Sequence, residues 1–358
     1  MSRQPKVVFV DHSFHRVTGS SRFFSDILRG ASNVVELECE GWRGGAKVSA
    51  EDVDSVDADV AVFWQTLPHL TDMLRLRTPA VWVPMYDSAA LRPAVYWSVL
   101  PHTGIRILSF CRALSRLARR YGIPVSDYSY YPDPSQLPQM QAGQQGVRVF
   151  LWDRGDVGCE QLRALIGRQR VQRTILRASP DPGLRASRVS SGDVDAYNLR
   201  LVVGALPREE HLKLLSSCNV FIAPRRLEGI GLTFLEAMAM GLTVVAPDRP
   251  TMNEYIEHGV NGYLYDPLKP GTVELSGSSA VGVRARQSVF EGHQEWLAST
   301  DTVMTEILAA RPRSSIPSRQ VVAMAKLLTA AERAKSLLSP RHQAAVTQVL
   351  RLGRGRWN

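Results

Sequence analysis

The sequence has few cysteines, no long apolar run and no leader-like segment. Of its 358 residues only four are cysteines, and none forms a Cys-x-x-Cys pair, so neither a zinc site nor a disulfide framework is predicted. No apolar stretch reaches the roughly 18 residues that a membrane-spanning helix needs, and no signal-peptide core precedes the first strand-like run. We therefore expect a cytoplasmic protein whose cysteines are buried or idle thiols.

Familiar motifs of hydrolysis and phosphate binding are also missing. The sequence contains no Gly-x-Gly-x-x-Gly loop, P-loop, Gly-x-Ser-x-Gly or His-Glu-x-x-His. Asp-x-Asp strings occur at residues 52–54, 57–59 and 193–195, but they precede strands or lie in loops. We therefore expect neither a bound metal nor a cofactor.

Acidic residues are scarce at the end of the chain. Residues 311–358 contain ten Lys or Arg and a single acid, Glu332. This excess equals the net charge of the whole chain, +9, so the remaining body is neutral. Nucleic-acid binding would need aromatic side chains within a basic face, and the tail's one aromatic residue is Trp357. We therefore expect no nucleic-acid partner.

Part of this basic tail has the spacing of a helix. If residues 319–338 form a helix, one side carries the apolar residues Val321, Met324, Leu328 and Ala331, and the opposite side carries the bases Lys326 and Arg333. Two interpretations are open. The tail could hold the protein at an anionic membrane surface on the inner face, each base near it contributing up to about 1 kcal/mol. Alternatively, it is a solvated or self-packed helical extension.

Short apolar runs alternate with helical patterns in both halves of the chain, which is typical of parallel sheets with crossover helices. The expected strands cover residues 7–10, 60–64, 80–84, 105–110, 147–152, 174–178, 199–203, 219–223 and 242–246. The expected helices include residues 20–28, 112–121, 209–216 and 232–240. The fold class is therefore α/β, with two doubly wound Rossmann-like domains facing a cleft.

Changes in composition set the expected domain boundaries. The N-terminal domain covers residues 1–135, and a linker rich in Pro, Gln and Gly covers residues 136–146. The C-terminal domain covers residues 147–285. Aromatic and apolar spacing indicates a further helix over residues 286–310, before the basic tail of residues 311–358.

The stretch EGIGLTFLEAMAMG, residues 228–241, places two carboxylates around a glycine-containing helix start. Gly229 and Gly231 permit a close backbone approach, and the N–H groups at a helix start attract anions such as a diphosphate. Glu228 and Glu236 would be repelled by that anion, but each can accept two hydrogen bonds from a vicinal diol. Glu236 lies roughly 7 Å further along the helix axis, so it can reach a different part of the same ligand. The stretch therefore favours a ligand with a sugar and a ribose on either side of a diphosphate.

Residues 224–267, PRRLEGIGLTFLEAMAMGLTVVAPDRPTMNEYIEHGVNGYLYDP, resemble the donor-site segment of retaining GT-B glycosyltransferases of the group 1, family 4 class, with its E-x7-E motif. Residues 204–224 are similar to the segment that leads along the nucleotide base in that class. The resemblance implies that Glu228 contacts hydroxyls of the transferred sugar and Glu236 those of the ribose. The other donor-binding positions that it implies are Gly229, Ile230, Gly231, Leu232, Thr233, Leu206 and Arg225. The alternative is an ordinary core helix with Glu236 paired to a nearby arginine.

The sequence departs from that class at two places. The strand at residues 147–152 is followed by Arg154 but not by the lysine that usually accompanies it. Arg154 is therefore expected to neutralise the diphosphate alone or with Arg225 or Arg226, although each could be a solvated surface arginine. Where the class often has a histidine after a mid-domain strand, this chain has the segment VPMYDS, which contains Asp87. A catalytic histidine cannot be carried over to that place.

The first loop, DHSFHRVTGSSRFF at residues 11–24, resembles the glycine loop that approaches donor phosphate and acceptor in this class. Gly19, Ser20 and His15 are therefore assigned, together with Asp87, to the acceptor side. An ordinary helix N-cap explains Ser20 equally well, and a structural role is the alternative for His15.

The resemblance implies a glycosyltransferase that moves a hexose-type sugar from a nucleotide-diphosphate sugar to an acceptor hydroxyl with retention, with Glu228 and Arg154 as catalytic residues. A glycan or lipid-linked acceptor is expected, in the assembly of cell-surface polysaccharide or glycolipid. In this class the chain after the second domain crosses back to the first, which would bury Trp296. Two alternatives stay open: a non-catalytic sugar-nucleotide-binding or scaffold protein with this fold, and a nucleotide-sugar epimerase.

Overall fold

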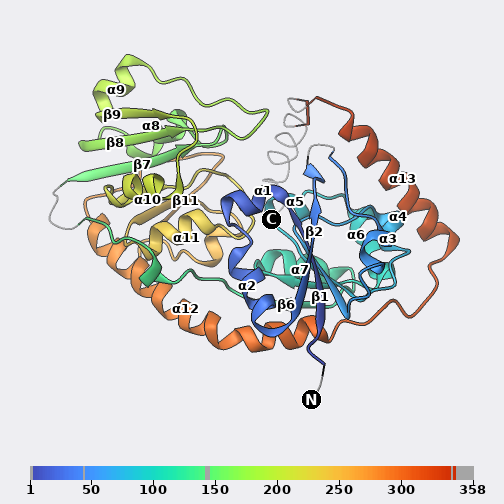
Figure 1. Ribbon diagram of the computed structural model, residues 1–358. Coiled ribbons are helices and arrows are strands. Elements are labelled where there is room, and N and C mark those ends of the chain that lie inside the picture. The colour runs from blue at the N-terminus through green and yellow to red at the C-terminus, as the bar shows by residue number, and fades with distance from the viewer. Residues whose placement is uncertain (1–2, 43–44, 142–145, 340–341, 344–358) are drawn as a thin grey trace. The chain divides into compact units, whose positions relative to one another are not determined.

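The computed structural model describes residues 3–42, 45–141, 146–339 and 342–343. Their contacts divide the chain into two compact units (Figure 1). Unit 1 combines the chain up to Tyr128 with residues 297–343, and unit 2 consists of Ser129–Trp296. Each unit is built on its own six-stranded sheet.

In unit 1 all strands are parallel and lie in the order β2-β1-β3-β4-β5-β6. The strands are β1 (Lys6–His12), β2 (Asn33–Cys39), β3 (Val60–Trp64), β4 (Ala80–Val83), β5 (Arg106–Ser109) and β6 (Val125–Asp127). The helices are α1 (Ser13–Thr18), α2 (Arg22–Ala31), α3 (Ala50–Asp54), α4 (Leu70–Met73), α5 (Tyr86–Ala89), α6 (Ala94–Val99), α7 (Arg112–Arg120) and α13 (Arg319–Ser336). The central strand β3, VAVFW, is buried along its whole length, as a parallel strand covered on both faces requires.

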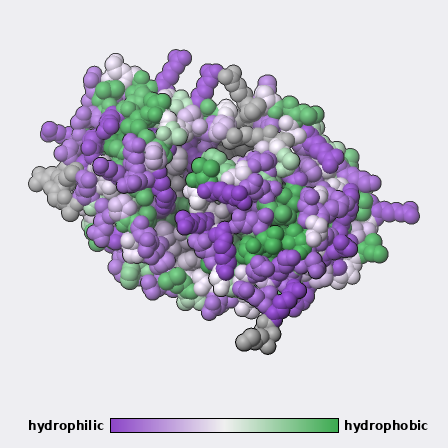
Figure 2. All heavy atoms as spheres, viewed as in Figure 1, coloured by the Kyte–Doolittle hydropathy of each residue, from purple (hydrophilic) through white to green (hydrophobic). Residues whose placement is uncertain are grey.

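In unit 2 the parallel strands lie in the order β12-β11-β10-β7-β8-β9. They are β7 (Val147–Asp153), β8 (Val171–Ala178), β9 (Leu199–Val203), β10 (Val220–Ile222), β11 (Thr243–Pro247) and β12 (Tyr263–Tyr265). The helices are α8 (Cys159–Ile166), α9 (Ser191–Tyr197), α10 (Arg208–Ser216) and α11 (Leu232–Ala239). The long α12 (Ser278–Leu308) follows and belongs to unit 2 up to Trp296 and to unit 1 from Leu297. Figure 2 shows an apolar patch over the region of α9 and β9, and on the edge strand β9 Leu201 and Val203 are 47% and 74% exposed.

In both sheets the strand order reverses at the first strand of the unit, so that later strands are added on either side of it. In unit 1, β1 lies between β2 and β3, and in unit 2, β7 lies between β8 and β10. This is the doubly wound topology, in which a crevice opens at the carboxyl ends of the strands where the order reverses. The predicted α/β class with two doubly wound halves is confirmed.

The sequence prediction misses strands β2, β6 and β12, and it gives no range for helices α1, α3, α4, α5, α6, α8 and α9. Strand β2 is an edge strand with acids at alternate positions, and strands β6 and β12 have only three residues each. Short or half-solvated strands lack the continuous apolar run by which the others are recognised. Helix α1 forms where a loop is predicted, and the helix expected from residue 20 begins at Arg22 as α2.

The chain that enters unit 2 packs on that unit before the first strand. Residues 129–141 belong to it, and the Met140 N–H donates to the Met240 carbonyl at 2.8 Å. Helix α12 begins before the predicted residue 286. Trp296 is buried, as predicted, and lies edge-on to Tyr130 with the ring centroids 5.6 Å apart.

Helix α13 packs on unit 1, beside α4 and α6 (Figure 1). Its most buried side chains are Ala325 and Thr329, and the neighbouring Glu332 lies among bases of unit 1. Met324, predicted on the apolar side, is instead 37% exposed. Ala331 is exposed as well, whereas Val321 and Leu328 pack against the core of unit 1 as predicted. The buried side also includes a carboxylate, which the apolar pattern does not count. The helix packs on unit 1 and leaves the bases Lys326 and Arg333 exposed. The last part of the tail, residues 344–358, lies outside the described residues.

All four cysteines, Cys39, Cys111, Cys159 and Cys218, are buried, as predicted, and none of them forms a disulfide bond. Their thiols pack as small apolar groups. Within the described ranges, no helix is both long and apolar enough to cross a membrane.

Candidate functional site

Loops of unit 2 meet at the carboxyl ends of β7, β8, β10 and β11. The loops after β10 and β7 are joined by the Arg226 N–H, which donates to Asp156 Oδ2 at 2.9 Å. The loops after β11 and β10 are joined by the Thr251 hydroxyl, which donates to the Gly229 carbonyl at 2.8 Å. The loop after β8 joins them through Asp181, which accepts hydrogen bonds from Arg154 and Arg225. Because β7 and β10 flank the reversal of strand order, the topology also predicts a ligand here.

The start of α11 has the backbone that the glycine motif predicts. Gly231 is its N-cap with φ of +86°, and a Cβ there would lie 1.9 Å from the Phe234 ring. Glycine has no side chain with which to cap the first N–H groups of the helix, so these remain for a ligand or solvent. The Thr251 hydroxyl also donates to the Glu228 carbonyl at 3.1 Å, which holds the loop before the helix.

Asp181 brings Arg154 and Arg225 together. Arg154 follows β7, and its Nε and Nη2 donate to Asp181 Oδ1 at 3.0 and 2.7 Å. Arg225 follows β10, and its Nη2 donates to Asp181 Oδ2 at 2.6 Å. Burial, followed by the charge of Arg225, lowers the pKa of Arg154 from its ordinary value. The alternative of a solvated surface arginine does not describe either residue, since their side chains are only 22% and 16% exposed.

A third arginine, Arg177 of β8, lies beside this pair and is missed by the sequence prediction. Its guanidinium lies 4.4 Å from the centroid of the Trp152 ring, and that of Arg154 lies 4.7 Å from it. The Arg177 Nη1 is 2.9 Å from His211 Nδ1. Burial, followed by the charge of Arg177, lowers the pKa of His211 to about 4. The imidazole is therefore neutral near pH 7 and accepts this hydrogen bond.

The two glutamates of the motif differ in their surroundings. Glu228 is half-buried in the loop before α11 and acts electrostatically on Arg154. Glu236 lies on α11 with its side chain 16% exposed, and its Oε1 accepts from Nη2 of Arg208 at 2.6 Å. Burial raises the pKa of Glu236. This ion pair is the one that the ordinary-helix alternative predicts, so Glu236 needs a test that separates the two roles.

The remaining predicted donor-binding positions lie at the same edge of the sheet. Ile230 is buried, and Leu232 and Thr233 are half-buried in the first turn of α11. Leu206 is half-buried in the segment between β9 and α10. Because all strands of this sheet are parallel, the segments after β7, β9 and β10 share its carboxyl edge.

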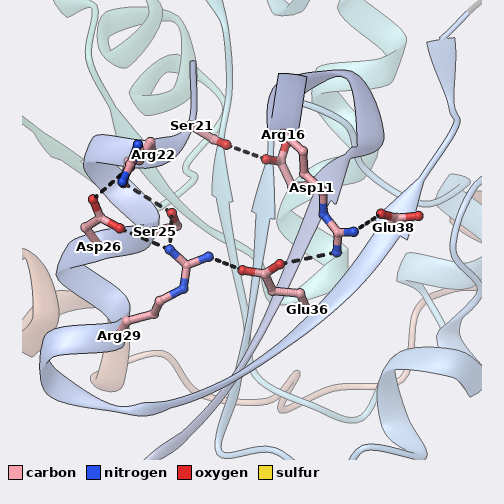
Figure 3. A network of polar contacts seen from close by, with 9 residues as sticks. All are labelled: Asp11, Arg16, Ser21, Arg22, Ser25, Asp26, Arg29, Glu36 and Glu38. Carbon is pink, nitrogen blue, oxygen red and sulfur yellow. Dashed lines mark hydrogen bonds and ion pairs between the residues drawn. The ribbon is translucent and has the colours of Figure 1, made fainter. Parts of the chain in front are cut away.

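In unit 1 the first loop folds around the carboxylate of Asp11. The His15 Nδ1 is 2.5 Å from Asp11 Oδ1. The Ser21 hydroxyl donates to Asp11 Oδ2 at 2.5 Å (Figure 3). His15 is buried in α1 and meets the Trp42 ring edge-on at 5.0 Å. Gly19 closes α1 with φ of +68°, and its N–H donates to the His15 carbonyl at 2.7 Å. Asp11 lies in the strand itself, and the sequence prediction misses it.

Charged side chains hold α1 and α2 against β2 (Figure 3). Arg16 of α1 pairs with Glu38 and Glu36 of β2 at 2.5 and 3.4 Å. Arg29 of α2 pairs with the same Glu36. Both helices are thereby tied to one edge strand, which positions the loop between them.

Two acceptor-side predictions are refined. Ser21, not Ser20, is the N-cap residue of α2, because α2 begins later than predicted. The Ser20 hydroxyl lies 3.0 Å from that of Thr18. Asp87 is buried in α5, after β4, at the same edge of the sheet as the first loop. The structure thus gathers His15, Gly19 and Asp87 at the carboxyl edge of unit 1.

Part of unit 2 matches a known protein family. Residues 196–273 match the family described as glycosyl transferases group 1. The amylovoran biosynthesis glycosyltransferase AmsK of Erwinia amylovora is 36% identical over 78 residues, which are 20% of this chain and 19% of that protein. The chain thus matches about a fifth of the relative's length, and the family match at residues 196–273 includes the motif of α11.

Solved structures resemble almost the whole chain. Sucrose-phosphate synthase from Thermosynechococcus elongatus has a TM-score of 0.60 at 14% identity, covering 86% of this chain and 100% of that one. HepE of Anabaena, solved in complex with UDP-glucose, has a TM-score of 0.54 at 13% identity, covering 83% and 100%. At such identities the likeness shows the fold, which is GT-B.

Proposed function

From the match of residues 196–273 to the group 1 glycosyltransferases, we propose that the chain is an enzyme of this group. It transfers a hexose-type sugar from a nucleotide-diphosphate sugar to an acceptor hydroxyl with retention. One observation carries the proposal. Arg154 and Arg225, together with the glycine-capped start of α11, gather at the carboxyl edge beside the strands where the order reverses. Cationic forks and helix N–H groups suit a diphosphate.

Each charged group then has a role in the reaction. Arg154, Arg225 and the first N–H groups of α11 hold the diphosphate, while Glu228 accepts hydrogen bonds from the sugar and Glu236 from the ribose. The bond from the anomeric carbon to the diphosphate oxygen breaks, and the acceptor oxygen bonds to the same face of that carbon. The acceptor proton passes to the departing diphosphate oxygen. Catalysis therefore consists of positioning and of stabilising the developing negative charge.

The comparisons suggest where to begin with substrates. HepE was solved with UDP-glucose, so uridine nucleotides are the first donors to test. The partial relative AmsK acts in amylovoran biosynthesis, which favours a growing polysaccharide or its lipid-linked precursor as acceptor. A scaffold protein that only binds the nucleotide sugar, or an epimerase that changes it, would not transfer sugar to an acceptor.

We expect nucleoside diphosphate to be released only when an acceptor is present, and to the same extent in EDTA. Within the described residues no group of three or more His, Cys, Asp or Glu side chains is arranged for a metal ion, and the arginines supply the positive charge. A nucleotide-sugar panel is first screened by thermal shift, and release is then measured with glycan and lipid-linked acceptors. Release that does not depend on acceptor, or that needs added Mg²⁺ or Mn²⁺, would contradict this assignment.

We further propose that the exposed bases of α13 attract an anionic membrane surface. The helix itself belongs to unit 1, so its removal would disturb the core, and neutralising Lys326 and Arg333 with glutamine is the cleaner test. Loss of these two bases is expected to lower the affinity for anionic liposomes, measured by co-sedimentation at low salt, by about tenfold. The matched control neutralises Arg116 and Arg120, exposed on α7. Equal binding by the two double variants, or no binding by the unaltered chain, would show that α13 is no membrane contact.

A further inference from the structure

The carboxylate of Asp181 divides its two oxygens between two arginines. Oδ1 accepts two hydrogen bonds from Arg154, and Oδ2 accepts one from Arg225. The two arginines come from the loops after β7 and β10, whereas Asp181 comes from the loop after β8. A single anion thus bridges two cations at the place where the topology predicts a ligand.

An arginine fork binds carboxylate and phosphate oxygens with the same planar, paired geometry. Asp181 therefore satisfies the donors that a bound phosphate would otherwise engage. The arrangement resembles that of Glu236, whose carboxylate is occupied by Arg208. In the ligand-free chain, charged groups of the proposed donor site are thus neutralised by other side chains.

Arg154, Arg177 and Arg225 lie close together and are largely shielded from water, so their positive charges repel one another and a nearby anion stabilises them. Burial and the charge of Arg225 lower the pKa of Arg154. Burial and the charge of Arg154 likewise lower the pKa of Arg177. Arg177 is 6% exposed, and its Nε has no hydrogen-bond partner among the residues that the structure describes. A carboxylate at this point stabilises the cluster, and a diphosphate, with more charge and more oxygens, would stabilise it further.

The segment that carries Asp181 leaves its side chain able to change position. Residues 179–190 form neither helix nor strand. Pro180 and Pro182 flank Asp181 and have no backbone N–H to donate. The Asp181 N–H donates to the Arg154 carbonyl at 3.0 Å, and Gly183 turns the chain with φ of +87°. The Ser179 N–H also donates to the Asp153 carbonyl at 3.0 Å, and the Leu184 N–H donates to the Asp181 carbonyl at 2.9 Å. The backbone is thus held in place, and the change of position is a rotation of the Asp181 side chain away from the arginines.

We propose that Asp181 is an internal counter-ion, which holds Arg154 and Arg225 in the ligand-free chain and is replaced there by the diphosphate of the donor. The inference rests on the proposed function and extends it. Asp181 keeps the arginines positioned before the donor arrives and competes with the diphosphate afterwards. Its return after transfer favours release of the nucleoside diphosphate product.

Asp181→Asn tests the competition, because the amide has nearly the same shape without the charge. We expect the full-length variant to bind inorganic pyrophosphate and UDP about tenfold more tightly than the unaltered chain in calorimetric titrations. Asp193→Asn is the matched control, since Asp193 pairs with Arg163 at 2.6 Å in the same unit but on helices α9 and α8. It is expected to lower stability without changing either affinity.

Hydrogen exchange on the unaltered chain gives a second measurement that does not depend on the folding of the variant. Saturating pyrophosphate is expected to increase exchange in peptides covering residues 179–187, because displacement of Asp181 loosens that loop. Unchanged or weaker binding by Asp181→Asn, or increased protection of the loop, would overturn the counter-ion role while leaving the donor site in place. Absence of diphosphate binding by both proteins would overturn the proposed function as well.

Discussion

Glu228→Gln is expected to lower the rate of sugar transfer at saturating donor by about 10² to 10³-fold, the size of effect found when one transition-state contact is removed from an active site. Glu228 lies half-buried at the loop before α11, and its carboxylate acts on Arg154, the residue that we propose holds the diphosphate. The amide keeps the shape of the side chain but lacks the negative charge that strengthens hydrogen bonds accepted from sugar hydroxyls. The rate is measured as acceptor-dependent release of nucleoside diphosphate.

Glu209→Gln is the matched control for this prediction. Glu209 is an exposed glutamate in the first turn of α10, in the same unit. Its variant is expected to transfer at the unaltered rate, and the melting temperatures of both variants should stay close to that of the unaltered chain. Transfer at full rate by Glu228→Gln would remove this residue from the catalytic centre.

Glu236 calls for a different comparison, because it already pairs with Arg208. If Glu236 binds the ribose, Glu236→Ala raises the KM for donor and lowers transfer severely, whereas Arg208→Ala leaves the carboxylate available and transfer largely intact. If the pair is only structural, the two variants behave alike. Arg208 has a side chain 60% exposed, so its truncation exposes little new apolar surface.

Features carried by local sequence patterns were predictable. Fully buried strands such as β3 and β11 show as uninterrupted apolar runs, and the glycines before α11 predict the helix start that the structure has at Gly231. The doubly wound class and the edge of the sheet that carries the donor motif follow from these patterns. Helix α10 was predicted to within one residue, because a proline sets its start and a strand closely follows its end.

Partners brought together by the fold were not predictable from local pattern. Asp181 lies 27 positions from Arg154, and Glu332 lies 285 positions from Lys47. The residues adjacent to a base in the sequence do not indicate which distant carboxylate will pair with it, because that pairing depends on how the fold places the strands and loops. The same holds for Asp11, whose role as the centre of the first loop appears only once α1 and α2 fold back toward β1.

Glu332→Gln is expected to lower the free energy of unfolding of unit 1 by about 3 kcal/mol, because it leaves buried bases without their counter-ion. The Glu332 Oε2 lies 3.0 Å from both Lys47 Nζ and His69 Nδ1, and its Oε1 meets Arg92. The side chain of Lys47 is 11% exposed and that of Glu332 21%. Burial lowers the pKa of Lys47, and the charge of Glu332 opposes that lowering.

Native-state hydrogen exchange in peptides from β3 and β4 measures this loss in unit 1 alone, whatever unit 2 does. The matched control is Asp26→Asn on α2, whose carboxylate is 56% exposed in its pairs with Arg22 and Arg29. Such exposed pairs contribute about 0.5 kcal/mol or less, so protection should hardly change. Equal effects of the two substitutions would show that Glu332 does not secure α13.

The pH dependence of the same variant gives an independent check with a defined sign. Burial alone would raise the pKa of Glu332, but the hydrogen bond from His69 and the charges of Lys47 and Arg92 outweigh it and hold that pKa well below its usual range. A carboxyl with a depressed pKa stabilises the fold fully above its unfolded pKa, about 4.3, and this contribution is lost as the pH falls. The stability difference between the unaltered chain and Glu332→Gln should therefore be constant near neutral pH and shrink on acidification below about pH 5. A difference that grows on acidification would mean that the carboxyl binds its proton more readily in the folded chain, and the ion cluster would then not be what fastens α13 to unit 1.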